Sequence, residues 1–350
     1  MQLNLRMGNT KVMSINRTIA QDFFMKVTIY DVAKEAQTSP STVSRVLNSS
    51  SLISDTKSEK ILQAAEKLGY QKRSIRKQRG RAVLSIKLVL GRFKDKKLPM
   101  FYSIPDLIQG IQYGVPDNKL NIICETSTEP DQLFANKKSG HTDAVIFAFT
   151  NVPKKTIKHL EENNIPFLVL NRAPLSHDFI AFNNEEGIFE VAKAAFANKK
   201  DLKPCLLEMN PKQEVTIERR RGYERACEEF NIKIPIVKTI KDIAAIDGKL
   251  IKDFKKKGIN CIICMNDTIA SKFMIFALDA GFNIPTDFSL TGFDGSTFNS
   301  MLPRKLDTIS LGIHDLGQKS GEWINKRVIS REDQKYQIRI NGKHLKGDTL

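Results

Sequence analysis

The chain has 350 residues, a length typical of two or three folded units, and its 41% hydrophobic content is enough for a substantial core. No apolar run approaches the ~20 residues of a membrane-spanning helix, so we expect no membrane segment. The formal net charge of +16 favours a polyanionic partner. Residues 26–81 hold 12 Lys and Arg against 5 Asp and Glu, so this part of the chain is disproportionately basic.

Residues 1–25 lack the continuous apolar core and the small-residue cleavage site of a secretion signal. We expect a disordered extension or an upstream-start artefact there, because Met25 looks like the natural start. The five cysteines are scattered and odd in number, which fits a reduced, cytoplasmic protein. Cys261 and Cys264 form a CxxC in a strand-like stretch that would direct them to opposite sheet faces, so we expect no metal site.

Two short helices around a tight turn are predicted within residues 27–48. Thr28 can cap the first helix, and Ser39 can cap the second, with Pro40 at the first helical position, where its missing N–H costs nothing. A third amphipathic helix, predicted over residues 59–70, supplies the apolar partner that the first two need.

The outer face of the second helix is short, polar and cationic. Arg45 can bond both acceptors of a guanine edge in the major groove, while Ser41 and Thr42 can reach bases or phosphates. The alternative is a capped helix pair that could lie on the surface of any protein.

The segments VTIYDVAKEA, SPSTVSRVLN and ILQAAEKLGY resemble, in order and spacing, the DNA-binding headpiece of the lactose/galactose-repressor (LacI/GalR) family. The resemblance implies double-stranded operator DNA as a partner, read by the second helix through Pro40, Ser41 and Arg45. The family usually has a glycine at Gln37, and a non-glycine residue with positive φ costs roughly 1 kcal/mol, so we expect a strained turn. The expected DNA contacts in these helices are Thr28, Tyr30, Ser39, Pro40, Ser41, Thr42, Ser44, Arg45 and Asn48.

The linker after these helices departs from the family. Lys72 and Arg73 stand where the family has Pro-Asn, and Arg76 and Arg79 replace its alanine and its wedging leucine. Arginine cannot act as an apolar wedge, but it can lie in a narrow minor groove or hold phosphates. We therefore expect Arg73, Arg76 and Arg79 to contact DNA; the alternative is a solvated basic linker.

From residue 83 onward, apolar strands alternate with amphipathic helices, which is typical of parallel α/β folds. There are too many strands for one simple sheet, so two similar doubly wound halves with a ligand between them fit the length. Strands are predicted over residues 83–90, 120–124, 144–149, 166–170, 204–207, 260–264 and 288–292, and helices over 104–113, 130–138, 154–163, 185–197, 216–230, 246–257, 267–281 and 313–328.

The segments FNNEEG, ERRRGYERA, MNDTIA and SLTGFDGS, which begin at residues 182, 218, 265 and 289, also resemble this family. The resemblance implies a two-subdomain, periplasmic-binding-protein-like core, with crossovers near 181–183 and Leu311. The expected domains are a helix-turn-helix headpiece at 26–71, a hinge at 72–81, an N-subdomain at 82–182 plus about 312–340, a C-subdomain at 183–311 and a tail at 341–350.

The resemblance places six residues at an effector cleft. Arg and Asp side chains can form charge-assisted bonds to vicinal hydroxyls, and an aromatic ring can cover the apolar face of a sugar. Simpler structural explanations are a helix cap at Asn266, a turn at Asp294 and core packing of Phe101 and Tyr102. Gly295 replaces an acidic residue that is common in the family. The six residues are Phe101, Tyr102, Asn171, Arg219, Asn266 and Asp294.

The leading hypothesis is a dimeric, sequence-specific transcriptional regulator, expected to repress carbohydrate-utilisation genes, that needs no cofactor and is controlled by a small effector. A saccharide is the expected effector, and a purine-like corepressor is the second candidate. A solute-binding protein of the uptake type would share the core but not the headpiece. An enzyme is disfavoured because the chain contains no phosphate-binding glycine loop, GxSxG or HExxH motif, and its five histidines have no apparent catalytic partner.

Overall fold

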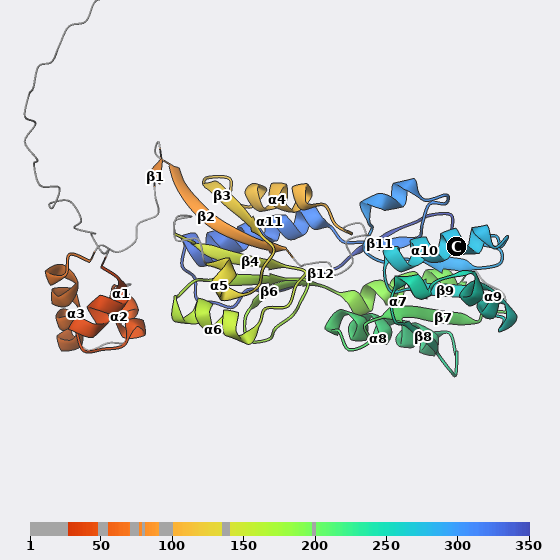
Figure 1. The fold of residues 1–350 in the computed structure, drawn as a ribbon, viewed down its shortest axis with the longest axis horizontal. Coiled ribbons are helices and arrows are strands. Elements are labelled where there is room, and N and C mark those ends of the chain that lie inside the picture. Colours follow the sequence, from red (N-terminus) through yellow and green to blue (C-terminus); the bar gives the residue numbers. More distant parts are fainter. Residues whose placement is uncertain are drawn as a thin grey trace, which may run out of the picture. The chain divides into compact units, whose positions relative to one another are not determined.

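The computed structural model describes residues 27–47, 55–70, 77–78, 81–90, 101–134, 141–197 and 201–350. The chain forms two compact units, one within residues 1–75 and the other within 76–350 (Figure 1). The N-terminal extension expected at 1–25, and Asn48, Arg73, Arg76 and Arg79, lie outside the described residues. Every helix of the described part is too short or too polar to cross a membrane.

The described part of the first unit forms three helices: α1 (Ile29–Glu35), α2 (Pro40–Leu47) and α3 (Asp55–Lys67). Thr28 begins α1 with a capping box, in which the Asp31 N–H donates to Thr28 Oγ1 at 3.4 Å and the Thr28 N–H donates to Asp31 Oδ2 at 2.8 Å. Their apolar faces meet in one small core, as the helical spacing predicts. Its buried members are Val32, Ala33, Val43, Ile61, Ala64 and Ala65.

The turn between α1 and α2 places Gln37 at φ 52°, in the left-handed region that favours glycine. The Thr38 N–H donates to the Ala33 carbonyl at 2.9 Å, and the Gln37 N–H donates to the Lys34 carbonyl at 3.3 Å. These bonds hold the chain in the turn although Gln37 carries a Cβ. The strained turn expected from the sequence is therefore present.

The N-subdomain of the second unit is built on a seven-stranded sheet of order β1-β2-β4-β5-β6-β12, with β3 also paired to β2. All pairs are parallel except the short β1–β2 pair. Helices α4 and α11 lie on one side of this sheet and α6 on the other (Figure 1). The strands are β1 (Lys77–Gln78), β2 (Arg81–Leu90), β3 (Lys119–Glu125), β4 (Ala144–Ala148), β5 (Phe167–Leu170), β6 (Asp178–Phe182) and β12 (Gln337–Ile340), and the helices are α4 (Ile104–Tyr113), α5 (Pro130–Leu133), α6 (Lys154–Glu162), α11 (Ile313–Trp323) and the π-helix η4 (Ile324–Ile329).

Glycines bring α4 and α11 into close contact. A Cβ on Gly114 would lie 2.2 Å from the Gln318 carbonyl oxygen, and one on Gly321 would lie 2.4 Å from the Ile111 carbonyl oxygen. Both obstacles are backbone atoms, which a side-chain rotation cannot move. The two helices therefore pack against each other backbone to backbone.

The C-subdomain holds a four-stranded parallel sheet of order β10-β9-β7-β8 and a separate antiparallel pair, β11–β13. Its core includes Cys264 of the CxxC beside Cys205. The strands are β7 (Pro204–Met209), β8 (Ile236–Ile240), β9 (Cys261–Cys264), β10 (Ser289–Thr291), β11 (Thr308–Ser310) and β13 (Lys343–Leu345), and the helices are α7 (Asn184–Ala197), α8 (Glu214–Glu229), α9 (Gly248–Lys256), α10 (Asp267–Asp279) and the 3-10 helices η2 (Ile243–Ala245) and η3 (Thr297–Met301).

The chain crosses between the subdomains three times, after β6, after β11 and after β12, whereas the sequence predicted two crossovers. The expectation that 341–350 forms a tail is wrong, because β13 pairs with β11 and Thr349 is fully buried. The Thr349 Oγ1 donates to the Leu290 carbonyl at 2.7 Å, and the Asp307 N–H donates to Thr349 Oγ1 at 2.9 Å. These bonds join the end of the segment to the C-subdomain.

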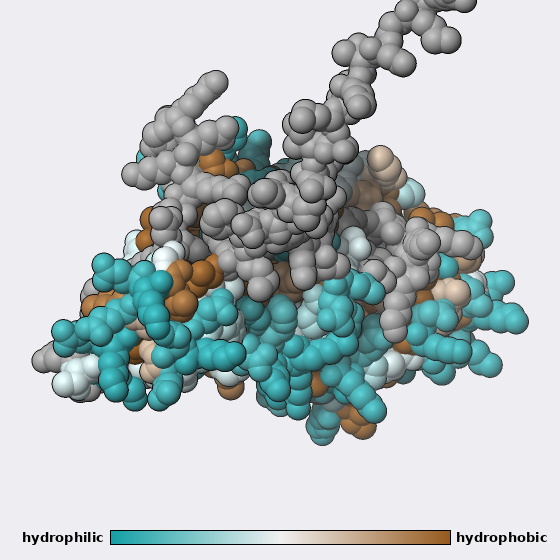
Figure 2. All heavy atoms as spheres, turned by 60° about the vertical axis from the view of Figure 1, so that its left-hand side comes forward, coloured by the Kyte–Doolittle hydropathy of each residue, from teal (hydrophilic) through white to brown (hydrophobic). Residues whose placement is uncertain are grey.

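The surface is mainly hydrophilic on the face that Figure 2 presents, and hydrophobic side chains occur there in small separate areas. Among the described residues, the most exposed large hydrophobic side chains are Met301 at 87%, Leu175 at 80% and Ile234 at 80%. Isolated exposed apolar side chains of this kind are normal for a folded protein.

Relief of the strained turn gives a stability prediction. Gln37→Gly should raise the free energy of unfolding of the headpiece by about 0.5 to 1 kcal/mol, because glycine adopts positive φ without a Cβ clash. Hydrogen exchange of the α1 and α3 amides measures this change. The exposed helical residue Gln63 is the control, since Gln63→Gly should destabilise by about 1 kcal/mol. Equal destabilisation by both substitutions would contradict the strain.

Candidate functional site

The headpiece presents polar side chains at the start of α2. Ser39 caps this helix, because the Thr42 N–H donates to Ser39 Oγ at 3.2 Å. The Ser39 hydroxyl also lies 2.8 Å from Ser41 Oγ and 2.7 Å from Thr42 Oγ1. Capping is thus one role of Ser39, and the exposed Ser41 lies beside it on the same turn.

The other predicted DNA contacts have different positions. Thr28 caps α1, and Tyr30 is 45% exposed on the same helix. Pro40 begins α2, as predicted, and Ser44 is partly exposed on it. Arg45 lies within α2, and its side chain is outside the described part of the structure.

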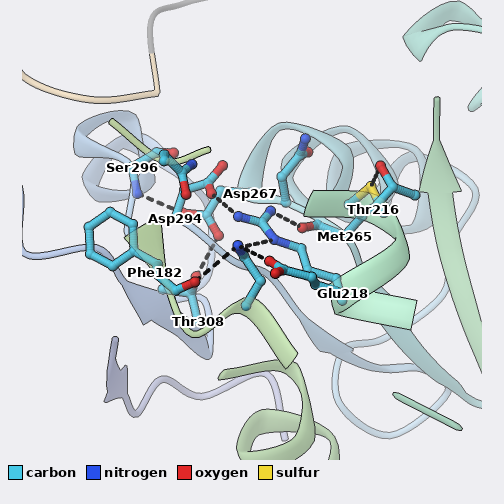
Figure 3. A network of polar contacts seen from close by, with 12 residues as sticks. Phe182, Thr216, Glu218, Met265, Asp267, Asp294, Ser296 and Thr308 are labelled. Carbon is cyan, nitrogen blue, oxygen red and sulfur yellow. Dashed lines mark hydrogen bonds and ion pairs between the residues drawn. The ribbon is translucent and has the colours of Figure 1, made fainter. Parts of the chain in front are cut away.

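Arg219 and Asp294 form a buried ion pair in the C-subdomain (Figure 3). Arg219 lies on α8, and its Nη2 donates to Asp294 Oδ1 at 3.1 Å. The guanidinium also donates from Nε to Asn184 Oδ1 at 3.0 Å and from Nη1 to the Met265 carbonyl at 2.6 Å. Its Cζ lies 3.8 Å from the centroid of the Phe293 ring. Together, these contacts orient the guanidinium.

The backbone at the carboxylate is unusual. Asp294 has φ 116° and Gly295 has φ 65°. A Cβ on Gly295 would lie 2.6 Å from the Ser310 Cα, so this packing excludes an acidic residue there and accounts for the departure from the family. The Asp294 N–H donates to the Ile309 carbonyl at 2.8 Å, and its carbonyl accepts from the Leu311 N–H at 3.0 Å. The segment before the second crossover therefore holds Asp294 in a strained conformation.

Burial dominates the electrostatics of this pair. Loss of solvation raises the pKa of Asp294 to about 7, although the positive charge of Arg219 acts in the opposite direction. Burial also lowers the pKa of Arg219, and Asp294 opposes that change. A carboxylate with a pKa near neutrality is a common feature of functional sites.

Two residues beside the pair have structural roles. Asn266 caps α10, since its Oδ1 accepts from the Ile269 N–H at 2.9 Å, which leaves its Nδ2 able to donate elsewhere. Asp267 accepts from the Ser296 N–H at 2.6 Å and from Thr308 Oγ1 at 2.5 Å. Burial raises the pKa of Asp267, and these donors oppose the rise. Asp267 thus joins α10 to the segment that carries Asp294.

The N-subdomain contributes a second group of predicted residues. Phe149 and Asn171 follow β4 and β5 with φ 56° and 55°, so two adjacent strands end in left-handed residues. The rings of Phe101, Tyr102 and Phe149 pack together, with centroids 4.2 to 5.1 Å apart. Asn171 and Tyr102 are each 4% exposed, and the Asn171 Oδ1 and the Tyr102 hydroxyl have no hydrogen-bond partner. Buried polar atoms without partners are rare, which makes both atoms candidate ligand contacts.

A cavity of about 240 Å³ lies where the two subdomains approach each other. Arg172 is its cationic member, and it donates from Nε to Asn151 Oδ1 at 3.2 Å and from Nη1 to the Asn171 carbonyl at 2.6 Å. Burial lowers the pKa of Arg172, while Glu214 opposes this change. The lining residues are Thr150, Asn151, Val152, Ile157, Phe167, Val169, Arg172, Pro174, His177 and Glu214.

The structure does not bring all six predicted effector residues together. Arg219 and Asp294 touch each other, and Phe101 and Tyr102 touch each other, but none of the six lines the cavity. Sequence reasoning missed Arg172, although it follows Asn171 directly, and it missed Asn184 within the FNNEEG segment. Of the three consecutive arginines, Arg219 is buried and Arg221 is exposed, whereas Arg220 is partly buried and pairs with the buried Glu208.

The comparisons with known proteins agree with this architecture. Residues 28–72 match the family described as bacterial regulatory proteins, lacI family, and residues 203–349 match the periplasmic binding protein-like domain. The first match covers the helix-turn-helix unit, and the second covers most of the C-subdomain. The first match covers the three headpiece segments almost completely, and the second covers three of the four core segments, all except FNNEEG at residues 182–187.

Relatives extend the similarity to nearly the whole chain. The ribose operon repressor of Halalkalibacterium halodurans is 28% identical over 92% of this chain and 96% of its own length. The lac repressor dimer bound to operator and the anti-inducer ONPF is 21% identical over 92% of this chain and 98% of that one, with a TM-score of 0.61. The transcriptional regulator CelR–cellobiose complex is 16% identical over 93% and 100%, with a TM-score of 0.65. Residues 28–72 thus match the lacI family of bacterial regulatory proteins, and the whole chain is similar to regulators that share this two-part architecture.

Proposed function

We propose that this protein is an operator-binding repressor whose affinity for DNA is controlled by a saccharide bound between the core subdomains. The buried Arg219–Asp294 pair is the observation that carries the effector part of the proposal, because its charged groups lie beside the segments that join the subdomains. Members of this family regulate transcription and are not enzymes. An uptake-type binding protein would not need the helix-turn-helix unit at residues 28–72.

Several chemical features favour a saccharide. Arg219 and Asp294 do not line the cavity, but its Arg172 lies close enough to Arg219 for their charges to interact. The cavity combines a guanidinium, an amide and a hydroxyl, from Arg172, Asn151 and Thr150, with an apolar wall. Polar groups of this kind bond sugar hydroxyls, while apolar side chains cover the C–H face. The names of the relatives point the same way, since one is a repressor of a ribose operon and another is a complex with cellobiose. D-ribose and cellobiose are therefore the first compounds to test.

We also propose a homodimer that acts in the cytoplasm. One helix-turn-helix unit reads only a few base pairs, so two half-sites are needed for useful specificity. The similar lac repressor structure is a dimer bound to operator, which supports this assembly. Effector control then consists of a shift between DNA-competent and DNA-incompetent dimers.

The DNA-binding part of the proposal separates two kinds of arginine. Arg45→Ala should cost about 1 to 3 kcal/mol of discrimination per half-site, because it removes a base contact. Arg76→Ala and Arg79→Ala should weaken binding to all sequences alike and make it less dependent on salt. Gel shifts with selected and random duplexes at several salt concentrations measure both effects. The same loss of specificity in all three variants would contradict the division of roles.

The effector part predicts a separation of functions at Asp294. Asp294→Asn should remove the saccharide response, since the neutral amide loses the charge-assisted acceptor, while DNA binding without effector persists. Effector titrations of operator binding measure both properties. Asp253→Asn is a matched control, because that carboxylate pairs with Lys257 at the exposed end of α9. An unchanged titration in the Asp294 variant would exclude the residue from the site.

A pH dependence follows from the pKa of Asp294, which burial raises to about 7. Saccharide affinity should fall up to about tenfold per pH unit as the pH drops below 7, because protonation removes the carboxylate. Stability has the opposite trend: a raised folded pKa contributes stability at low pH that is lost as the pH rises from about 4 to 7. Calorimetric titration across this range measures the affinity. Identical pH profiles in the wild type and in Asp294→Asn would refute the assignment.

A further inference from the structure

The segments that join the two subdomains lie side by side. The Asn183 N–H in the first crossover donates to the Ile340 carbonyl at the third, at 2.9 Å. A Cβ on Gly342 in the third crossover would lie 2.3 Å from Ile309 Cγ2, just before the second. The three segments are therefore packed against one another where the chain passes between the subdomains.

A continuous chain of polar contacts leads from Asp294 to these segments. Arg219 donates to Asp294 at 3.1 Å and to Asn184 Oδ1 at 3.0 Å. The Asn184 Nδ2 donates to Glu218 Oε2 at 2.9 Å (Figure 3). The other oxygen of Glu218 pairs with Arg339 Nη1 at 3.0 Å. Asn184 follows the first crossover and Arg339 precedes the third, so the chain of contacts reaches both.

Glu218 is the branch point of this chain. One of its oxygens binds the C-subdomain, through Asn184, and the other binds the N-subdomain, through Arg339 on β12. Within the described ranges, the pair of Glu218 with Arg339 is the one ion pair that links the two subdomains. Arg339 Nη1 also lies 3.5 Å from the carbonyl of Phe182, the last residue before the first crossover. The Glu218 side chain is only 17% exposed, so solvent screens its charges incompletely.

We propose that Glu218 and Arg339 form a relay that couples the Arg219–Asp294 pair to the angle between the subdomains. The inference rests on the proposed function, in which the effector engages Arg219 and Asp294. When the guanidinium turns toward a ligand, its hydrogen bond to Asn184 changes. Asn184 then changes its own hydrogen bond to Glu218, and with it the position of the Glu218 carboxylate. The ion pair with Arg339 then changes in strength, which shifts the balance between two subdomain arrangements. Glu218 and Arg339 are positioning residues, since neither needs to touch the ligand.

The test measures the distance between the subdomains in the full-length protein without any ligand. Cys124 is exposed on β3, whereas the other four cysteines are fully buried, so Cys124 and an introduced Lys252→Cys on α9 can carry two spin labels. Double electron–electron resonance of labelled protein, diluted with unlabelled protein, gives the distribution of distances between the two labels. Glu218→Gln and Arg339→Gln should each change the ratio of the two arrangements by about two- to fivefold. The double variant should equal the single variants, because all three remove the same contact.

Two further variants control for indirect effects. Arg339→Lys keeps the charge and should restore most of the wild-type distribution. Arg225→Gln is the matched control, because Arg225 pairs with Glu185 and Glu186 inside the C-subdomain and its side chain is 38% exposed, against 39% for Arg339. The relay is overturned if the Glu218 and Arg339 variants behave like Arg225→Gln, or if their effects add in the double variant.

The same proteins distinguish failure of the relay from failure of the proposed function. Titration with D-ribose and cellobiose, read by calorimetry and by operator binding, tests effector binding. If both sugars bind and release DNA while the distance distributions stay at wild type, the relay alone is wrong. If neither sugar nor any other saccharide binds, the effector proposal is wrong. The ligand-free distances still decide whether Glu218 and Arg339 control the angle between the subdomains.

Discussion

A buried guanidinium must satisfy its donors within the protein, and Arg219 imposes this requirement on the whole C-subdomain. Its carboxylate partner, a side-chain amide and a main-chain carbonyl come from three separate segments of the chain. Removal of any one partner would leave a charge poorly solvated, at a cost of several kcal/mol. The backbone has positive φ at both Asp294 and Gly295, and Ser310 leaves no room for a Cβ at Gly295.

This requirement also suits the pair to a switch. A ligand that offers hydroxyl groups to Arg219 and Asp294 competes with bonds that already exist, so its binding energy depends on how the subdomains are arranged. A ligand shifts a conformational balance only by as much as its affinities for the two states differ. Because the segments that connect the subdomains bond directly to this network, small changes at the pair can bias the geometry of the core. DNA binding by the headpiece would then depend on which arrangement of the core is favoured.

Much of this organisation could be predicted from the sequence. Hydrophobic spacing, caps and motif order gave the three helices, the alternating α/β core and the family, and Gln37 has the positive φ expected of the turn. The strands β8, β12 and β13 were missed because they are short and partly exposed, and therefore lack a clear apolar run. The strands β6 and β11 were also missed, although they are largely buried, because they are only 5 and 3 residues long. Glu218 was missed because its importance comes from Arg339, a partner distant in sequence. Arg172 was missed because only the fold brings it into one cavity with Asn151 and Glu214. Sequence spacing alone could not separate Asn266 as a helix cap from Asn266 as a ligand contact.

The reciprocity of ligand and DNA binding tests the central claim most directly. If one conformational balance links the two sites, the factor by which a saccharide changes operator affinity must equal the factor by which operator changes saccharide affinity. Calorimetric titration of the full-length protein with D-ribose or cellobiose, with and without an operator selected from random duplexes, measures both factors. We expect the two factors to be equal and clearly different from one. A saccharide affinity that stays the same whether or not operator is bound would contradict the account.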